Sequence, residues 1–137
     1  MKSEEELLDL ARKRSWKYIS QYQKLSEKFI EKFKDKVDWE NISYSQKLSE
    51  SFIEKFQDKV VWHWISEKEK LSESFIEKFK NKVDWKNISQ FQKLSEEFVL
   101  NNFSKIYLNK LKQNEYFNFN NIKNIELKLL LELRGEH

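Results

Sequence analysis

The chain has 137 residues, of which 39% are hydrophobic, 15% aromatic and 36% charged. Its net charge of +3 is small for a nonspecific DNA-binding protein, whose affinity comes from many uncompensated phosphate contacts. The absence of cysteine excludes disulfides and thiolate metal sites, and no apolar run reaches the roughly 18 residues that a membrane span needs. With no proline and one glycine the chain lacks the usual residues of tight β-turns, so we expect a folded all-α protein with a phenylalanine-rich core.

The first predicted element is an N-terminal capping helix within residues 1–15. Ser3 and Glu6 have the spacing of a capping box, which predicts the start of this helix. Leu7 and Leu10 fall in phase with apolar positions of the helices that follow. The acidic start of the chain is not typical of a secretory signal or a transit peptide.

Residues 16–107 hold four copies of a 23-residue repeat. The spacing is kept by the following residues: Trp16, Trp39, Trp62 and Trp85; Ile19, Ile42, Ile65 and Ile88; Ser20, Ser43, Ser66 and Ser89; Leu25, Leu48, Leu71 and Leu94; and Phe29, Phe52, Phe75 and Phe98. In one continuous helix, 23 residues would turn each apolar face by about 140° relative to the last. The repeats would then share no common face, so the chain must break within every copy.

The break is predicted at a serine followed three residues later by Gln or Glu, which is the pattern of a capping box. Such pairs occur at Ser20, Ser43, Ser66 and Ser89. Each repeat is then a one-turn helix, capped by Asp38 or Asp84 in two copies, followed by a long helix of roughly 14 to 16 residues. Because one such unit could not bury its Trp, Leu and Phe alone, we expect a single-domain, short-repeat α-solenoid over residues 1–137.

Residues 108–137 are predicted to be a divergent C-terminal capping segment. Leu108 and Leu111 stand where a fifth Trp and Ile would fall, and "NEYFNFNN" (114–121) has the composition of a loop. A final helix is predicted over 122–134, ended by Gly135. Its leucines lie on more than one face, which fits either a cap over the last repeat or a homodimer interface.

The motifs W-x-x-I-S and Q-K-L-S-E-x-F-I-E-K-F resemble a short tandem repeat of uncharacterised proteins from giant DNA viruses, phages, AT-rich bacteria and their mobile elements. The resemblance covers residues 16 to about 100 and does not extend to the C-terminal segment. It implies a repeat scaffold with no established reaction and no catalytic residues to transfer.

Catalytic and metal-binding chemistry is not favoured by the residues themselves. His63 lies three residues before Ser66, but no third group of a catalytic triad is suggested. Carboxylates recur at helical spacing, as in Glu27, Glu31 and Asp35, on a face expected to be solvated. There is no glycine-rich phosphate loop. We therefore expect no enzyme activity and no cofactor.

The third copy breaks the repeat pattern: it contains "VWHWIS" (61–66) where its neighbours have "VDWENIS" and "VDWKNIS". Trp64 points away from the buried face of a single turn and is expected to be partly exposed, and Val61 lacks the capping Asp. Two explanations stay open: neutral drift, or an aromatic rim that binds a partner. The candidate partner-binding residues are Trp62, His63, Trp64, Tyr18, Tyr44 and Phe91.

Two function hypotheses follow. The first is a protein-binding scaffold in the cytoplasm of a host cell, and a specific form of it is an anti-CRISPR-type inhibitor of a host defence nuclease. The second is RNA or DNA binding along a lysine strip on the helix edge. The strip consists of Lys32, Lys55, Lys78, Lys36, Lys59 and Lys82.

Overall fold

The computed structural model describes residues 1–135, and this part of the chain is all-helical, with no strand. The α-helices are α1 (Glu4–Lys13), α2 (Trp16–Tyr22), α3 (Glu27–Lys32), α4 (Trp39–Ser45), α5 (Glu50–Lys55), α6 (Trp62–Lys68), α7 (Glu73–Lys78), α8 (Trp85–Phe91), α9 (Glu96–Asn101), α10 (Leu108–Leu111) and α11 (Ile125–Leu133), with a 3-10 helix η1 (Phe119–Asn121). Within residues 1–135 no helix combines the length and the apolar character needed to cross a membrane. The predicted repeat of helix pairs every 23 residues is confirmed.

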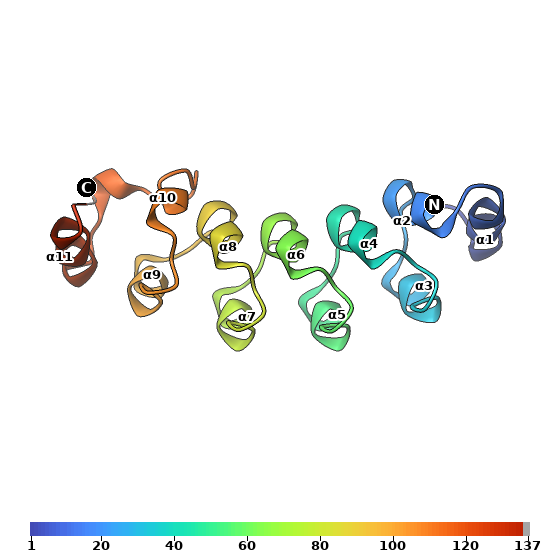
Figure 1. Ribbon diagram of the computed structural model, residues 1–137, viewed down its shortest axis with the longest axis horizontal. Coiled ribbons are helices and arrows are strands. Elements are labelled where there is room, and N and C mark those ends of the chain that lie inside the picture. The colour runs from blue at the N-terminus through green and yellow to red at the C-terminus, as the bar shows by residue number, and fades with distance from the viewer. Residues whose placement is uncertain (136–137) are drawn as a thin grey trace. The chain divides into compact units, whose positions relative to one another are not determined.

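The chain divides into two compact units, the first Met1–Ile65 and the second beginning at Ser66. A single domain over residues 1–137 stays a prediction, and residues 136–137 lie outside the described part of the chain. In the first unit α2 and α4 lie side by side in one row, and α3 and α5 form a second row (Figure 1). In the second unit α8 and α10 pair in the same way, and α11 packs on α9.

Each helix of a pair buries one aliphatic side chain completely. These residues have no solvent exposure: Ile19, Ile42, Ile65 and Ile88 in the first helices of the repeats, and Ile30, Ile53, Ile76 and Val99 in the second helices. The repeat tryptophans pack beside this core. Trp39, for example, stacks on Phe52 and contacts Phe56, with ring centroids 6.2 and 5.3 Å away. Its indole N–H donates to the Lys34 carbonyl, so the repeat Trp has a structural role.

The position of the break inside each repeat differs from the prediction. Ser20 does not cap a long helix, because it lies inside α2, where its Oγ donates to the Trp16 carbonyl and accepts from the Asp38 amide of the next repeat. The second helix begins after Ser26, whose Oγ accepts from the Phe29 amide. Its equivalents Ser49, Ser72 and Ser95 cap α5, α7 and α9 in the same way. Each repeat is therefore two short helices, and the first is longer and the second shorter than predicted.

A glutamine side chain links consecutive repeats. Gln46, three residues after Ser43, was predicted to complete a capping box, but its amide is used across the repeat boundary. Its Nε2 donates to the carbonyls of Ser20 and Gln23, and its Oε1 accepts from the Leu25 amide. Gln92 makes the equivalent three bonds in the second unit. The buried amide thus satisfies backbone groups in the extended linker of the preceding repeat.

The carboxylate row predicted to be solvated also links repeats. Both oxygens of Glu27 accept bonds from Ser49, one from its amide and one from its hydroxyl. Glu73 binds Ser95 in the same way. These glutamates fix the capping serine that starts the next helix, so they are structural residues.

The C-terminal segment is a degenerate fifth repeat. Leu108 and Leu111 are buried at the positions of Trp and Ile, as predicted. Asn114 replaces the linking glutamine and donates to the carbonyls of Ser89 and Gln92. Asn124 replaces the capping serine of α11, but it follows Leu108 by 16 residues, whereas Ser95 follows Trp85 by 10. The extra residues form the predicted loop, and Gly135 (φ +74°) ends α11 in the left-handed conformation expected of a C-terminal glycine.

At the other end, α1 begins with the predicted capping box. Ser3 Oγ accepts from the Glu6 amide, and the Glu6 carboxylate accepts from the Ser3 amide. These bonds favour the charged carboxylate and hold the pKa of Glu6 below its ordinary value. Leu7 is buried against the first repeat, as its phase predicted.

Candidate partner-binding surface

The third-copy residues that depart from the repeat form an aromatic cluster in the first unit. Trp64 is half-buried, as predicted. Its ring meets the Tyr44 ring edge-on, with centroids 4.7 Å apart, and the His63 ring edge-on at 4.6 Å. His63 is exposed and Tyr44 is 43% exposed. We call Tyr44, His63 and Trp64 the aromatic rim.

The aromatic rim borders an open groove of about 550 Å³. Its lining residues come from α2, α4 and the start of α6: Lys17, Gln21, Asp38, Glu40, Asn41, Tyr44 and Trp64. The groove therefore combines two aromatic rings with amide and charged side chains. Large aromatics with a polar tip, set among hydrogen-bonding groups, are typical anchors of protein interfaces.

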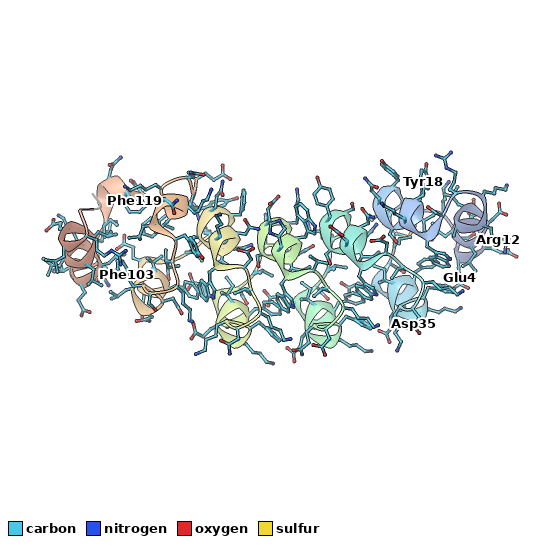
Figure 2. All side chains as sticks on the ribbon, viewed as in Figure 1. Glu4, Arg12, Tyr18, Asp35, Phe103 and Phe119 are labelled. Atoms are coloured by element: carbon cyan, nitrogen blue, oxygen red, sulfur yellow. The ribbon has the colours of Figure 1, made fainter. Side chains whose placement is uncertain are left out.

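The other predicted rim residues lie elsewhere. Trp62 is half-buried, and its indole N–H donates to the Gln57 carbonyl, as those of Trp39 and Trp85 donate to Lys34 and Lys80. Tyr18, labelled in Figure 2, packs against Tyr22 at 5.0 Å and under the Arg14 guanidinium at 4.4 Å. Phe91 belongs to the second unit, where it lines a different groove. Of the six candidates, Trp64 therefore contacts two others, Tyr44 and His63.

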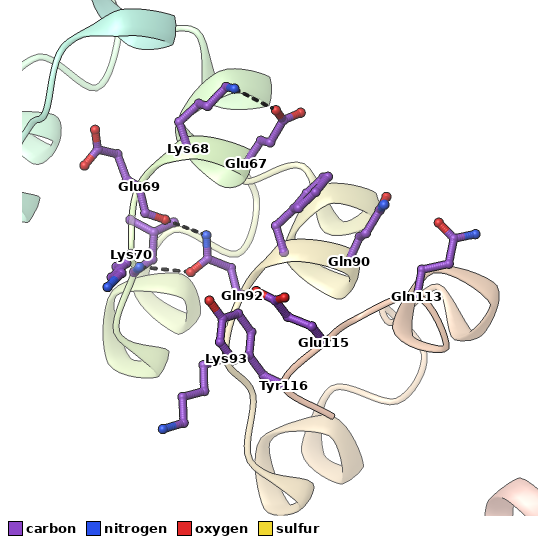
Figure 3. A pocket seen from close by; sticks show the side chains of 12 residues that line it. Glu67, Lys68, Glu69, Lys70, Gln90, Gln92, Lys93, Gln113, Glu115 and Tyr116 are labelled. Carbon is purple, nitrogen blue, oxygen red and sulfur yellow. Dashed lines mark hydrogen bonds and ion pairs between the residues drawn. The ribbon is translucent and has the colours of Figure 1, made fainter. Parts of the chain in front are cut away.

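The second unit has a groove of about 730 Å³, drawn in Figure 3. Residues 67–71, 90–93, 113, 115 and 116 line it. Gln92 lies at its base, bonded to the Leu71 amide and the Glu69 carbonyl. Because this side chain occupies the linker's backbone groups, a ligand would bind through side chains rather than by adding a β-strand. The exposed rings are Phe91 and Tyr116, and hydrogen bonding to Glu115 raises the pKa of Tyr116.

Four lysines that sequence reasoning missed share the position after the linking Gln or Glu. They are Lys24, Lys47, Lys70 and Lys93. Lys24 and Lys47 line a groove of the first unit, and Lys70 and Lys93 line the groove of Figure 3. All four are exposed, and none has an ion-pair partner within residues 1–135. The signal was present in the constant Lys of the repeat, but the predicted long helix placed it on an ordinary solvated face.

Three of the six lysines of the strip, in contrast, are paired with acids, whereas Lys36 has no ion-pair partner within the described residues. Lys32 binds Glu4 at 2.9 Å, Lys55 binds Glu31 at 2.8 Å, and Lys59 lies 3.9 Å from Asp35. Lys78 and Lys82 also have interaction partners. Exposed pairs of this kind add little stability, but they reduce the positive charge that a phosphate backbone would meet. The basic and acidic rows therefore interleave across repeats.

The described residues contain no group of three or more His, Cys, Asp or Glu arranged to hold a metal ion. Comparison of the chain with protein-family models, curated proteins and solved structures finds no match.

Proposed function

We propose that this protein is a non-enzymatic, protein-binding helical-repeat scaffold, and that the aromatic rim with its groove is the binding surface. One observation carries the proposal. The third copy has a large aromatic, Trp64, where the second and fourth copies have Asn41 and Asn87, and the ring lies on exposed Tyr44 rather than in the core. A chain that needs only repeat packing has no use for an indole at this place, whereas an interface anchor does.

The resemblance to viral and mobile-element repeats suggests a specific form of this function. An anti-CRISPR-type inhibitor would bind a host defence nuclease in the cytoplasm of the host cell through such a surface. This finer form depends on the resemblance alone and stays a prediction.

The test compares wild type with Trp64→Asn, which restores the residue of the neighbouring copies. Because the edge-on pair with Tyr44 contributes about 0.5–1.5 kcal/mol, unfolding should be easier by about 1 kcal/mol. Trp39→Ala, which removes a structural indole, should cost about 3–5 kcal/mol. Urea unfolding followed by circular dichroism measures both losses.

Partner retention is measured in nuclease-treated lysate of the native cells, with wild type, Trp64→Asn and Phe91→Ser as immobilised baits. We expect one protein to be retained by wild type and by Phe91→Ser, and to be depleted about tenfold or more on Trp64→Asn, as for a binding hot spot. Equal retention on wild type and Trp64→Asn would contradict the proposal. If wild type retained the partner from untreated lysate but not from nuclease-treated lysate, the result would instead favour the nucleic-acid function.

Nucleic-acid binding is the second candidate, and one observation supports moving it from the lysine strip to the groove of Figure 3. That groove combines Lys70 and Lys93 with the exposed rings of Phe91 and Tyr116. Cations beside stacking rings are typical of surfaces that bind single strands.

A further inference from the structure

A small basic pocket in the first unit is lined by the start of α1, by α3 and by the linker before α3. Its volume is about 190 Å³. Its charged lining residues are Lys2, Glu4, Lys24, Lys28 and Lys32. Lys32 binds Glu4 at 2.9 Å, but the other three lysines have no ion-pair partner within residues 1–135. We call this the lysine pocket, and its lining has three positive charges that no carboxylate neutralises.

Two of these three lysines depart from the repeat pattern. Lys28 stands where the second and third copies have Ser51 and Ser74, and where the fourth has a glutamate. Lys2 directly precedes the first capping serine, so it stands where the repeats have a buried leucine such as Leu25. The end of a repeat stack needs a polar outer face, which explains a polar residue at position 2. It does not explain the lysine at position 28, which belongs to the first full repeat and lines the same pocket.

The acids nearest to the lysine pocket do not cancel its charge. Glu6 is bonded to the capping serine of its helix, and these bonds, more than the charge of Lys2, lower its pKa. Both oxygens of Glu27 accept bonds from Ser49. Glu5 is exposed and does not line the pocket. The pocket therefore stays cationic although acidic residues surround it.

We propose that the lysine pocket binds a phosphate monoester on a serine or threonine side chain of another protein. Its volume is well below the roughly 300–1,000 Å³ of usual small-molecule sites, so it suits one compact group. Three lysines match a phosphate monoester, with a charge of about −1.5 to −2 at pH 7, better than a carboxylate with a single charge. The pocket is separate from the aromatic rim, and its binding does not depend on the function proposed for the rim.

An extended anionic surface fits this site less well than a single phosphorylated side chain. The first turn of α1 has three consecutive acids, Glu4, Glu5 and Glu6. A membrane surface or a nucleic-acid strand placed over the pocket would also meet these carboxylates, which repel it. A phosphate on one side chain needs only the pocket.

The test uses three short labelled peptides that differ at one central residue, which is phosphoserine, glutamate or serine. Binding to the full chain is measured by fluorescence anisotropy at physiological ionic strength. We expect the phosphoserine peptide to bind about fivefold or more tightly than the glutamate peptide. Lys2→Gln with Lys28→Ser should weaken its binding about tenfold or more, because two of the three unpaired charges are removed. The matched control Lys36→Gln with Lys47→Gln removes the same charge from exposed lysines outside the pocket and should change binding less than about twofold.

Residues 2 and 28 are exposed, so the double variant should fold, which circular dichroism checks, and Lys28→Gln alone should lose about two- to fivefold. Equal affinity for the phosphoserine and glutamate peptides would overturn the proposal, and so would equal losses in the double variant and its control. Inorganic phosphate that competes as tightly as the peptide would assign the pocket to the free ion instead. Phosphatidic acid vesicles that bind wild type but not the double variant in a flotation assay would overturn it in favour of a membrane.

Discussion

At the scale of single residues, the linking glutamine explains why these repeats can be so short. The segment between two helices of a repeat is extended, so backbone groups such as the Gln23 carbonyl and the Leu25 amide have no partner within a helix. Gln46 and Gln92 supply one acceptor and two donors to that segment from the next repeat. A buried backbone group left unsatisfied costs about 1–3 kcal/mol, so these bonds offset part of the cost of burying the linker.

Gln92→Met keeps the length of the side chain but removes its donors and acceptor. We expect a loss of about 2–4 kcal/mol in the free energy of unfolding, because the Leu71 amide and the carbonyls of Ser66 and Glu69 lose their partner. Urea unfolding measures the loss. The control is Gln90→Met, on the same helix but half-buried at its surface, which should change stability by less than about 0.5 kcal/mol. Equal effects of the two variants would contradict the linking role.

The sequence could not reveal this role, because a capping box and a bridging amide have the same spacing. Ser20 with Gln23 and Ser26 with its following residues are both acceptable starts of a helix, and local patterns alone favoured the wrong one. The choice depends on Gln46, 23 residues after Gln23, whose side chain occupies the linker. The identical Trp spacing, in contrast, predicted the repeat because it needs no knowledge of contacts.

At the scale of helices, capping decides where the tryptophan helix begins. Asp38 and Asp84 accept bonds from the amides of Asn41 and Asn87 at 3.0 and 3.2 Å, and Ser15 does the same for Tyr18. In α6 the equivalent residue is Val61, which can accept from the Trp64 amide through its backbone carbonyl alone. A helix of seven residues has little stability of its own, so one missing cap is a large fraction of its local free energy.

Val61→Asp restores the cap and should therefore stabilise the protein by about 0.5–2 kcal/mol, which is what Asp38→Ala should lose. Both changes are measured as shifts in the midpoint of urea unfolding at neutral pH, where the carboxylate is charged. Val61→Asn is the matched control for charge, since it can cap equally well. A lower midpoint for both Val61 variants would show that packing of the half-buried valine outweighs the cap.

The lengths of the helices were harder to predict than their existence, because the ends depend on contacts between repeats. The apolar stripe from Leu48 to Val60 continues in phase through a linker end, a short helix and a turn, so periodicity alone suggested one long helix. At the C-terminus Asn114 takes the place of the linking glutamine and Asn124 that of the capping serine, and the loop between them is longer than in the other repeats. Leu108 and Leu111 showed the register of a fifth repeat in the sequence, but the longer loop obscured where its second helix begins.

At the scale of the whole molecule, the small net charge hides a division between paired and unpaired lysines. Three lysines of the strip end helices and Lys36, Lys59 and Lys82 lie in the turns that follow, and sequence spacing could not show that Glu4, Glu31 and Asp35 lie beside Lys32, Lys55 and Lys59. These pairs join residues more than 20 positions apart, so they arise only when repeats pack. The same holds for predicting the aromatic rim from the sequence: the partial exposure of Trp64 was predictable, but its contact with Tyr44 was not.

This division sets the salt dependence of any nucleic-acid binding. For single strands the slope of log K against log salt is about −0.7 per neutralised phosphate. The six lysines of the strip would give about −4, whereas Lys70 and Lys93 of the groove would give about −1.4. We expect the shallow slope and a dissociation constant no tighter than about 10⁻⁴ M at physiological salt, measured by anisotropy with labelled single-stranded RNA. Lys70→Gln with Lys93→Gln should abolish the binding, and the matched pair Lys55→Gln with Lys59→Gln should leave it unchanged. A steep slope that disappears with the second pair would show instead that the strip binds phosphates despite its ion pairs, and would make nucleic-acid recognition the better account of this protein.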